Sequence, residues 1–423
     1  MSRLPRLLCW LGLPAALLSA ALLLIAADRN GGAETPAPAP RGTPPARTTA
    51  EPEPEPPADP FDRYLDADLP LADGFDFPVG NADGKGAYTD PATGKTHHGF
   101  YVATQFGDRI SLGLHPGEDW NGRGGGNTDQ GQPVHAVAAG RAVHVSEGAA
   151  LWGGVVMIEH LYHENHEKHR IRSLYAHLGR IDVREGQDVE RRQVIGTIGR
   201  DPDGLYLAHL HLELRRDLEL PALYWPELHK RDMAWIREHY AAPTAFIATH
   251  RNLPVPQREP RLVLVHQQGY RMRTYEQGQQ TGDFAVSFGQ GRGRKRRRGD
   301  LKTPQGMYFV VERHKGEFGG EFGEYYGGYW IKINYPNPYD AAWGLEQKLI
   351  TGSQRRQIAQ AWASRKLTPG HTRLGGGIGF HGWIEEWNDD GPRHLSWGCV
   401  VMHLGDIARV YEQLTPGTMV VIF

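Results

Sequence analysis

Short runs of alternating or continuous apolar residues, separated by glycines, recur along most of this chain of 423 residues. Glycine occurs 53 times, and helical periodicity is scarce. The segments 134–138, 142–145, 155–160 and 172–178 have the length and the flanking turn residues that are typical of β-strands. The sequence therefore predicts a mainly β protein in which many turns connect short strands.

Three segments favour helices instead, at residues 228–240, 353–363 and 406–414. In the last of them Ile407, Val410, Tyr411 and Leu414 recur at helical spacing and predict an apolar stripe. Asp406 precedes this stripe and is expected to be the N-cap of the helix. A few helices are thus expected beside the strands.

The N-terminus has the pattern of an export signal. Arg3 and Arg6 precede an apolar stretch that runs to residue 27, which is nearly the roughly 20 residues that span a bilayer. Residues 1–27 are therefore either a cleaved signal peptide or a retained N-terminal membrane anchor, and the rest is expected in the periplasm or cell envelope. Residues 28–60 are rich in Pro, Ala, Thr and Glu, and they predict a disordered linker.

The remaining length is enough for two domains of ordinary size. The proline-punctuated stretch LPVPQREP, at 253–260, indicates the boundary between them. We expect one domain at 61–254, a short linker at 255–261 and a second domain at 262–423. The formal net charge of −2 argues against a general polyanion binder.

Three histidine-containing segments stand out in the first domain: HPGED from His115 to Asp119, YAH ending at His177, and His209-Leu-His211. Residues two apart on a strand share a face, so His209 and His211 are expected to point the same way. Two imidazoles and one carboxylate make a three-ligand zinc site that leaves a position open for water, which is typical of catalytic zinc. Histidine pairs on strands also occur without metal.

The stretch 114–215 resembles the lysostaphin-type (LytM-like) zinc endopeptidases of peptidoglycan. The matching pieces are HPGED, GQPVHAVAAGRAVHV, SLYAHL, VREGQDV, IGTIG and HLHLELR, in the family's order. The resemblance implies one Zn²⁺ per chain, held by His115, Asp119 and His211. It implies that His177 and His209 act on the water and the developing oxyanion. The implied fold is a small antiparallel β-sheet with an open groove.

A single cysteine remains for the folded part, because Cys9 lies inside the export segment. Cys399 is therefore either an inert buried residue or a reactive thiol. The segment Phe380-His381-Gly382 precedes Leu395-Ser396-Trp397-Gly398-Cys399 by less than twenty residues. A histidine beside a cysteine nucleophile is expected to raise the fraction of thiolate at neutral pH. Backbone N–H groups around 397–399 are expected to form an oxyanion hole.

Residues 262–423 resemble the L,D-transpeptidase (YkuD-like) catalytic domain. The matching pieces are LKTPQGMYFV with its TPxG turn, GFHG, SWGCVVM and the closing GTMVVIF. The resemblance implies a β-rich sandwich with Cys399 as nucleophile and His381 as base, while Ser396 and Gly398 support the loop. Family members often carry His before the glycine and Asn or Arg two residues after the cysteine, where this chain has Trp397 and Val401. A carboxypeptidase or amidase activity of this module therefore stays open.

Other clusters of histidine and basic residues are interpreted as solvated loops. They are His160, His163, His166 and His169, the pair His97 and His98, and the basic run 292–298. For the basic run, contact with the anionic carboxylates of stem peptides is the alternative to a solvated loop. A second metal site and nucleic-acid binding are accordingly not expected.

The predicted function is a bifunctional peptidoglycan-remodelling enzyme. A zinc-dependent peptidase would hydrolyse peptide cross-links, and a cysteine-dependent module would join stem peptides through an acyl-enzyme. The alternative is that one or both modules are non-catalytic and bind the wall or activate a separate hydrolase. The bond that is cut, the acyl acceptor and the oligomeric state are left open by the sequence.

Overall fold

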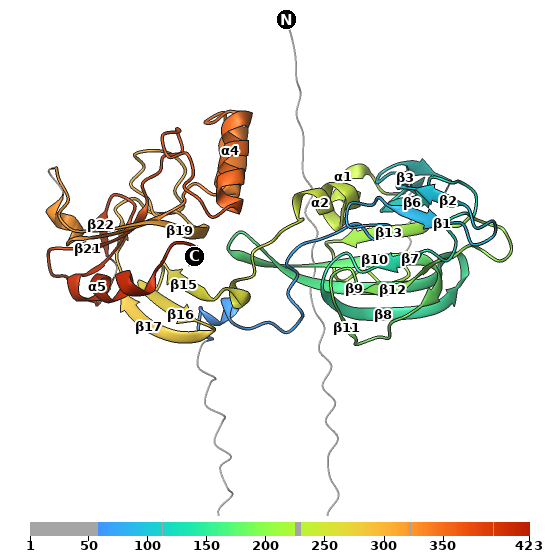
Figure 1. Cartoon of the computed structure of the whole chain (residues 1–423), viewed down its shortest axis with the longest axis horizontal. Helices are drawn as coiled ribbons and strands as arrows, with labels where there is room; N and C mark the ends of the chain where they lie inside the picture. The colour runs from blue at the N-terminus through green and yellow to red at the C-terminus, as the bar shows by residue number, and fades with distance from the viewer. Residues whose placement is uncertain (1–57, 112, 225–229, 321–322, 392) are drawn as a thin grey trace, which may run out of the picture. The chain divides into compact units, whose positions relative to one another are not determined.

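The computed structural model describes residues 58–423, apart from residues 112, 225–229, 321–322 and 392. Strands dominate, and they form one large sheet in each half of this range (Figure 1). The predicted mainly β, two-domain fold with few helices is confirmed. The predicted export segment and nearly all of the predicted linker lie outside the described residues. Within the described range, no helix is long and apolar enough to cross a membrane.

The elements of the first half have the following bounds: η1 Asp62–Tyr64, β1 Ala87–Thr89, β2 Thr96–His98, β3 Phe100–Thr104, β4 Arg109–Ile110, β5 Gly113–Leu114, β6 Glu118–Gly122, β7 Pro133–His135, β8 Gly140–Ala149, η2 Ala150–Trp152, β9 Gly153–Glu164, β10 Glu167–Ile181, β11 Asp188–Val189, β12 Val194–Ile198, β13 Leu210–Arg215, α1 Met233–His239, β14 Tyr240–Ala241, α2 Pro243–Thr249 and η4 Pro256–Arg258.

The sheet of this half has the strand order β11-β8-β9-β10-β13-β6-β3, and all of these pairs are antiparallel. Along β13 the side chains alternate between its two faces. Leu210, Leu212 and Leu214 are fully buried in the main hydrophobic core. The residues between them are therefore placed on the opposite face, and His211 is one of these.

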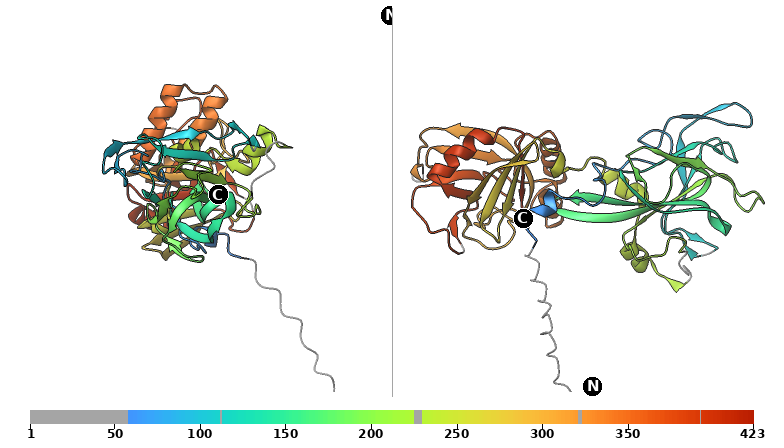
Figure 2. Two further views of the ribbon diagram at one scale, coloured as in Figure 1. Left: turned by 90° about the vertical axis from the view of Figure 1, so that its right-hand side faces the viewer. Right: turned by 90° about the horizontal axis from the view of Figure 1, so that it is seen from below.

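Strands β9 and β10 form a long hairpin, which the right panel of Figure 2 shows as the long green pair of strands. Its turn is Asn165-His166, and Asn165 has a φ of 59°, the left-handed conformation that asparagine tolerates better than most residues. The interpretation of the histidines at 160–169 as a solvated loop is wrong. His160 and His163 lie in β9 and have no exposed surface.

Local partners explain why these histidines are buried. The His160 ring bonds to the Ala139 carbonyl at 2.9 Å and to the Ser173 hydroxyl at 2.7 Å. The His163 ring stacks on Tyr64, with ring centroids 5.9 Å apart. The one metal-competent cluster of the described residues lies elsewhere, as shown below. His97 and His98, also interpreted as loop residues, form part of the short strand β2.

The elements of the second half have the following bounds: β15 Arg261–His266, β16 Arg271–Glu276, β17 Gln279–Ala285, β18 Phe288–Gly289, β19 Gly306–Lys315, η5 Glu324–Tyr326, β20 Tyr329–Ile333, α3 Pro338–Glu346, α4 Gly352–Ala363, β21 Gly379–Trp383, β22 His394–Ser396, β23 Val400–His403, α5 Leu404–Gln413 and β24 Met419–Ile422.

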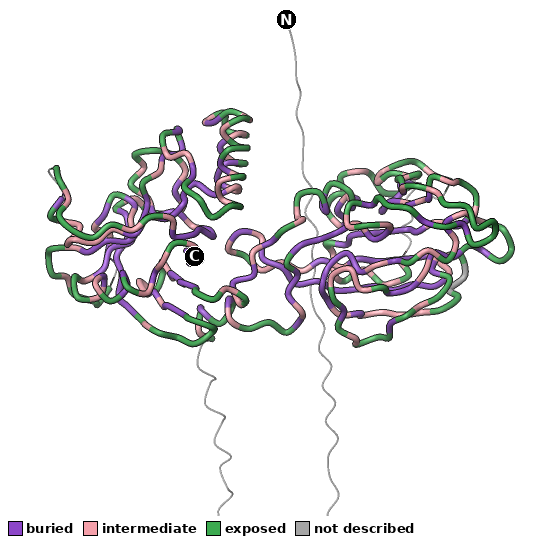
Figure 3. The backbone as a smooth tube through the Cα atoms, viewed as in Figure 1, coloured by how far each residue is buried: buried purple, intermediate pink, exposed green. Residues whose placement is uncertain are grey.

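The sheet of this half is mixed, with the strand order β17-β16-β15-β24-β19-β20-β21-β23. The pairs β15–β24 and β21–β23 are parallel. Strand β15 is buried on both faces, since Val263 and Val265 join one core cluster and Leu262 and Leu264 another. Figure 3 shows the central strands as buried backbone and the connecting segments as mostly exposed. Tyr64 of η1, near the start of the described range, is buried in the same hydrophobic cluster as Leu262.

The predicted helices form with changed boundaries. Helix α1 begins at Met233, where the Asp232 side chain caps the Trp235 N–H at 2.9 Å, and part of the predicted segment falls on residues that are not described. Helix α4 matches its prediction. Helix α5 begins at Leu404 with His403 as N-cap, so the predicted N-cap at Asp406 is wrong. Strand β23 leads directly into the helix, which moves its start two residues towards the N-terminus.

Candidate functional site

The first candidate site lies where β6 and β13 pair. His211 of β13 is directly opposite Asp119 of β6, and His115 lies in the turn just before β6. Asp119 Oδ1 is 2.9 Å from His211 Nδ1 and 3.2 Å from His115 Nε2. The ligand atoms of the three side chains all lie within 4.8 Å of one another. The sheet thus brings together the three residues that the sequence resemblance implied as metal ligands.

Hydrogen bonds fix the tautomers of both imidazoles. His115 Nδ1 donates to the Gly117 carbonyl at 2.8 Å, so its Nε2 keeps a lone pair. His211 Nε2 lies 3.1 Å from Glu213 Oε1 and donates to it, which leaves Nδ1 for the cluster. Arg215 in turn donates to Glu213 Oε2 at 2.6 Å. Such outer partners orient metal-ligating histidines and increase their basicity.

Sequence reasoning missed Glu213 and Arg215. Their signal was present, because residues 209, 211, 213 and 215 in HLHLELR alternate with leucines and must share one strand face. Both side chains are fully buried, which a charged pair tolerates only when its hydrogen bonds are satisfied.

The electrostatics of this cluster favour a cation. Burial alone would raise the pKa of Asp119, but its hydrogen bonds with His115 and His211 lower that pKa far below its usual range. Burial lowers the pKa of His211, yet Asp119 and Glu213 together raise it to about 9, so without a metal this imidazole carries a proton on Nδ1 as well near pH 7. A metal at the cluster would displace that proton and leave the Nε2 proton hydrogen-bonded to Glu213. Two nitrogens and one carboxylate oxygen are a ligand set that zinc prefers. The residues present therefore fit a divalent metal with an open position.

His177 and His209 flank the cluster of His115, Asp119 and His211. Their ring centroids are 4.4 Å apart, and His209 Nε2 is 3.9 Å from Asp119 Oδ1. Burial lowers the pKa of both imidazoles, so they are neutral near pH 7. His177 lies at a bulge of β10 with a φ of 60°, a left-handed conformation that costs roughly 1–2 kcal/mol for a residue with a Cβ. Strain of this kind is typical of functional positions.

Tyr206 is a further neighbour of this pair that the sequence did not single out. Its ring centroid lies 4.3 Å from that of His177. It precedes the HLH motif by only three residues, but no periodic pattern marks it. Its contact with His177 depends on the connection between β12 and β13.

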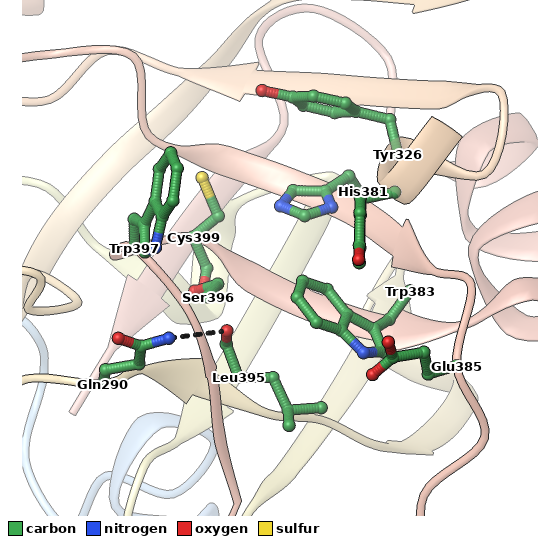
Figure 4. Close-up of a pocket in the computed structure, with 10 residues that line it drawn as sticks. Gln290, Tyr326, His381, Trp383, Glu385, Leu395, Ser396, Trp397 and Cys399 are labelled. Atoms are coloured by element: carbon green, nitrogen blue, oxygen red, sulfur yellow. Dashed lines mark hydrogen bonds between the residues drawn. The ribbon is translucent and has the colours of Figure 1, made fainter. Parts of the chain in front are cut away.

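The second candidate site is a pocket in the second half. Strands β21 and β23 are parallel neighbours, with His381 opposite Val401, and Cys399 immediately precedes β23. Cys399 and His381 therefore line one cavity of about 330 Å³. Figure 4 shows the Cys399 sulfur and the His381 ring on the same side of this pocket. Residues that lie eighteen positions apart are brought together here by sheet pairing.

The turn before Cys399 is held by Ser396 and Gly398. The Ser396 hydroxyl donates to the Cys399 carbonyl at 2.6 Å and accepts from the Gly398 N–H at 3.2 Å. Gly398 has a φ of 130°, and a Cβ there would lie 2.8 Å from the Lys302 carbonyl oxygen. Only glycine fits this position. Because Ser396 accepts the Gly398 N–H, that group is not available to the expected oxyanion hole.

The protonation states of the pair differ from the expected thiolate. Burial raises the pKa of Cys399 to about 11 and lowers the pKa of His381 to about 4. Both shifts favour a neutral thiol and a neutral imidazole near pH 7 over the expected thiolate, while the Cys399 side chain itself is only partly buried. His381 Nδ1 donates to the Gly382 carbonyl at 2.7 Å. This tautomer leaves Nε2 as a proton acceptor.

Aromatic and acidic groups that the sequence did not single out complete the pocket. Tyr326 packs on His381 with ring centroids 4.7 Å apart, and Figure 4 shows Trp383 and Glu385 along the opposite wall. Trp397, which stands where family members often have His, is 59% exposed at the pocket edge. Tyr326 and Glu385 lie outside the motifs recognised in the sequence, whereas Trp383 directly follows GFHG and Trp397 lies within SWGC.

Known proteins match each half separately. A family model for the L,D-transpeptidase catalytic domain, YkuD, matches residues 260–422, and one for Peptidase family M23 matches residues 115–220. Among curated proteins, the lipoprotein NlpD of Yersinia enterocolitica is 31% identical over 86 residues, which make up 20% of this chain and 79% of that protein.

Three solved structures are similar to parts of the chain. The catalytic domain of the prophage-encoded M23 protein EnpA from Enterococcus faecalis is 24% identical, with a TM-score of 0.22, over 28% of this chain and 81% of that one. The antimicrobial peptidase lysostaphin from Staphylococcus simulans is 19% identical, with a TM-score of 0.25, over 36% and 50%. The helical cell shape determining protein Pgp2 from Campylobacter jejuni is 21% identical, with a TM-score of 0.26, over 39% and 47%. The family models and the curated relative show that the chain belongs to peptidase family M23 through residues 115–220, and its residues 260–422 match the L,D-transpeptidase catalytic domain, YkuD.

Proposed function

We propose that this protein is a bifunctional peptidoglycan-remodelling enzyme, with a zinc metalloendopeptidase at residues 61–254 and a cysteine L,D-transpeptidase at residues 262–423. One observation carries the proposal. Each module keeps its full set of reactive groups within one site, with His115, Asp119 and His211 in the first and Cys399 with His381 in the second. The substrates are peptidoglycan stem peptides and their cross-links.

In the peptidase, His115 Nε2, Asp119 and His211 Nδ1 would hold one Zn²⁺. When bound, zinc polarises the scissile carbonyl and makes water a better nucleophile at neutral pH. His177 and His209 are neutral and lie beside the ligands, so they can accept a proton from the attacking water. One of them can return that proton to the amine that leaves.

In the transpeptidase, the Cys399 sulfur attacks a carbonyl of the donor stem peptide while its proton passes to His381 Nε2. The peptide bond then breaks, the proton goes to the leaving amine, and a thioester remains on Cys399. An amine of a second stem attacks the thioester and forms the new amide bond. Its proton passes through His381 and restores the thiol.

The same chemistry implies a place in the cell. A peptidoglycan substrate and the similarity to a lipoprotein support a periplasmic or envelope location. Residues 1–27 would then be a signal peptide or a membrane anchor, and residues 28–60 would be a disordered spacer between membrane and wall. Nucleic acid is not among the proposed partners.

A second candidate concerns the cysteine module alone. Trp397 is largely exposed at the pocket edge, and Val401 is opposite His381 in the neighbouring strand. If the acceptor amine is poorly held, water takes its place and the product is a shortened stem, as in a carboxypeptidase. A non-catalytic role for either module predicts no product at all.

Mass spectrometry of peptidoglycan fragments tests both modules. Purified wild-type protein, His211→Ala and Cys399→Ala are incubated with zinc and intact sacculi, and the soluble and bound muropeptides are compared. We expect His211→Ala to lose cleavage of cross-links and to keep acyl transfer, and Cys399→Ala to show the reverse. If both variants give the wild-type products, the proposed function is wrong.

A further inference from the structure

The basic run at 292–298 lies in a loop, as interpreted from the sequence, with Arg292, Arg297 and Arg298 exposed, but other residues of this loop are anchored in the fold. Lys295 is only 4% exposed, and its Nζ donates to Asp300 Oδ1 at 2.7 Å. The second oxygen of Asp300 accepts the backbone N–H groups of Arg296 and Arg297 at 2.7 and 2.9 Å. The turn therefore has one fixed shape, which sets where its exposed arginines emerge.

Three of these cationic side chains already interact with partners within the domain. Arg294 pairs with Asp340 at 3.1 Å, Lys295 pairs with Asp300, and Arg296 lies over the Trp343 ring at 4.5 Å. Arg297 and Arg298 are exposed, and among the described residues neither guanidinium has a carboxylate partner within salt-bridge distance. Their charge is therefore available to a ligand.

A second segment brings a further arginine to the same place. The Arg298 N–H donates to the Arg373 carbonyl at 2.9 Å. Gly375 allows the close approach, because a Cβ there would lie 3.2 Å from the Arg298 Cα at a φ of 90°. Like the other two arginines, Arg373 is exposed and has no carboxylate partner in the described range.

The two segments enclose a cavity of about 260 Å³. Its lining residues are Arg297, Arg298, Leu349, His371, Thr372 and Arg373. None of them is acidic, and three carry a permanent positive charge. The Thr372 hydroxyl, on a residue only 4% exposed, is a buried polar group without a hydrogen-bond partner. Guanidinium forks with a nearby hydroxyl match a carboxylate or a phosphate.

The position of this cavity favours a carboxylate of the wall polymer. The chain runs from Arg373 to Gly377, whose carbonyl lies 3.8 Å from the Cys399 sulfur, and then into β21 with His381. Four residues of extended chain span at most about 14 Å, so the cavity and the nucleophile are within reach of one branched stem peptide. Stem peptides carry free carboxylates, and the polymer repeats them.

We propose that the cavity between Arg297, Arg298 and Arg373 binds a free carboxylate of a peptidoglycan stem peptide and holds the polymer beside the Cys399 pocket. This site rests on the proposed function, because the wall substrate selects a carboxylate over other anions. The cavity residues bind and position the substrate and take no part in bond making.

The test measures binding in the full chain with Cys399→Ala, which removes turnover. The probe is a soluble stem tripeptide with free carboxylates, compared by isothermal titration calorimetry with the same tripeptide amidated at each carboxylate. Arg298→Gln with Arg373→Gln should weaken binding of the free tripeptide by about tenfold or more, the loss expected when charge-assisted hydrogen bonds are removed. The amidated tripeptide should bind weakly to both proteins.

The matched control is Arg355→Gln with Arg356→Gln, two exposed arginines on α4 that remove the same charge. This pair should bind the tripeptide like the parent protein. Equal losses in both double variants, or none in the cavity variant, overturn the proposal. Inorganic phosphate that binds the cavity while the tripeptide does not would assign the site to a phosphate-bearing ligand instead.

Two further measurements distinguish a failure of the carboxylate site from a failure of the proposed function. Circular dichroism shows that the variants fold, which is expected because neither Arg298 nor Arg373 uses its guanidinium in an ion pair of the described structure. Acylation of Cys399 in the otherwise native chain tests the proposed function by itself. If the cavity variant is acylated normally and binds the tripeptide like the parent protein, only the proposal of a carboxylate site is wrong.

Discussion

Three histidines of the two sites each have one ring nitrogen committed to a fixed acceptor. His115 and His381 donate through Nδ1 to backbone carbonyls, and His211 donates through Nε2 to Glu213. Because a neutral imidazole carries one proton, this choice dictates which nitrogen does the chemistry. In the peptidase module the free nitrogens face Asp119, and in the cysteine module the free nitrogen is the proton acceptor.

The first prediction separates metal ligands from the residues that act on water. His211→Ala should lose zinc, because it removes one of three donors. His177→Ala should keep close to one zinc per chain and lose peptidase activity, because His177 lies beside His209 and is not one of the three clustered groups. Metal content by atomic emission and cleavage of cross-linked peptides are the measurements. Equal zinc loss in both variants contradicts this division.

The second prediction follows from the raised pKa of Cys399. With a pKa of about 11 the resting thiol should be alkylated by iodoacetamide more slowly than free cysteine at pH 8, and the rate should rise up to about pH 11. Acylation by a carbapenem should still occur at neutral pH, because His381 accepts the proton during attack. Intact mass should show an adduct that Cys399→Ser lacks.

The matched variant is His381→Ala. It should slow acylation by roughly 10²-fold or more, the usual contribution of a general base, and leave alkylation at pH 8 nearly unchanged. Rapid alkylation at pH 7 that depends on His381 would instead indicate a preformed thiolate and imidazolium pair.

Among the secondary-structure elements, strand β13 and the turn between β22 and β23 position most of the candidate site residues. Strand β13 buries leucines on one face and places His211, Glu213 and Arg215 in a row on the other. The turn between β22 and β23 presents Cys399 through a glycine that lies against the neighbouring Lys302 carbonyl. The alternation of leucines in the sequence predicts the strand. The conformation of the turn, in contrast, depends on packing against a segment that is distant in the sequence.

The third prediction tests this turn. Gly398→Ala should reduce carbapenem acylation of Cys399 by about tenfold or more while the domain stays folded, because the new Cβ would collide with the Lys302 carbonyl at a φ that favours glycine. Gly405→Ala, in the first turn of α5 with nothing within 4 Å of the added Cβ, is the control and should acylate normally. Equal rates for both variants contradict the proposed role of Gly398.

Across the whole molecule, several histidines are buried in the neutral form. Burial lowers the pKa of His160, His163, His166 and His381 to about 4 in each case. The cations Lys168 and Arg63 further disfavour a charged His163. In the unfolded chain these groups titrate near pH 6.5. Their contribution to stability is therefore present above about pH 6.5 and is lost as the pH falls through 4.

The fourth prediction is a steep loss of thermal stability in acid. The melting temperature should fall by several degrees between pH 7 and pH 4.5, because the unfolded chain binds protons that the folded chain excludes. His163→Met removes one such group whose ring nitrogens have no hydrogen-bond partner, and it should make the fall shallower. Exposed His314→Asn should leave the slope unchanged. Calorimetry at a series of pH values provides the comparison.

The amino-acid sequence by itself determined the β-rich class, the two modules and the short motifs that carry the chemistry. Alternation in HLHLELR specifies which residues share a face, and His115, Asp119 and Cys399 lie in motifs that can be recognised without any structure. The apolar stripe of α5 was likewise predictable from the sequence, because helical spacing is a local property. The same local patterns failed for the histidines of β9, where polar residues suggested a loop.

Tertiary structure decided everything that depends on partners distant in the chain. The Ala139 carbonyl and the Ser173 hydroxyl allow His160 to be buried, and desolvation of Cys399 in its pocket disfavours the expected thiolate. The arginine cavity exists only because Arg298 and Arg373 meet across separate segments. Local sequence specifies which face a side chain takes, whereas burial and charge depend on what packs against that face.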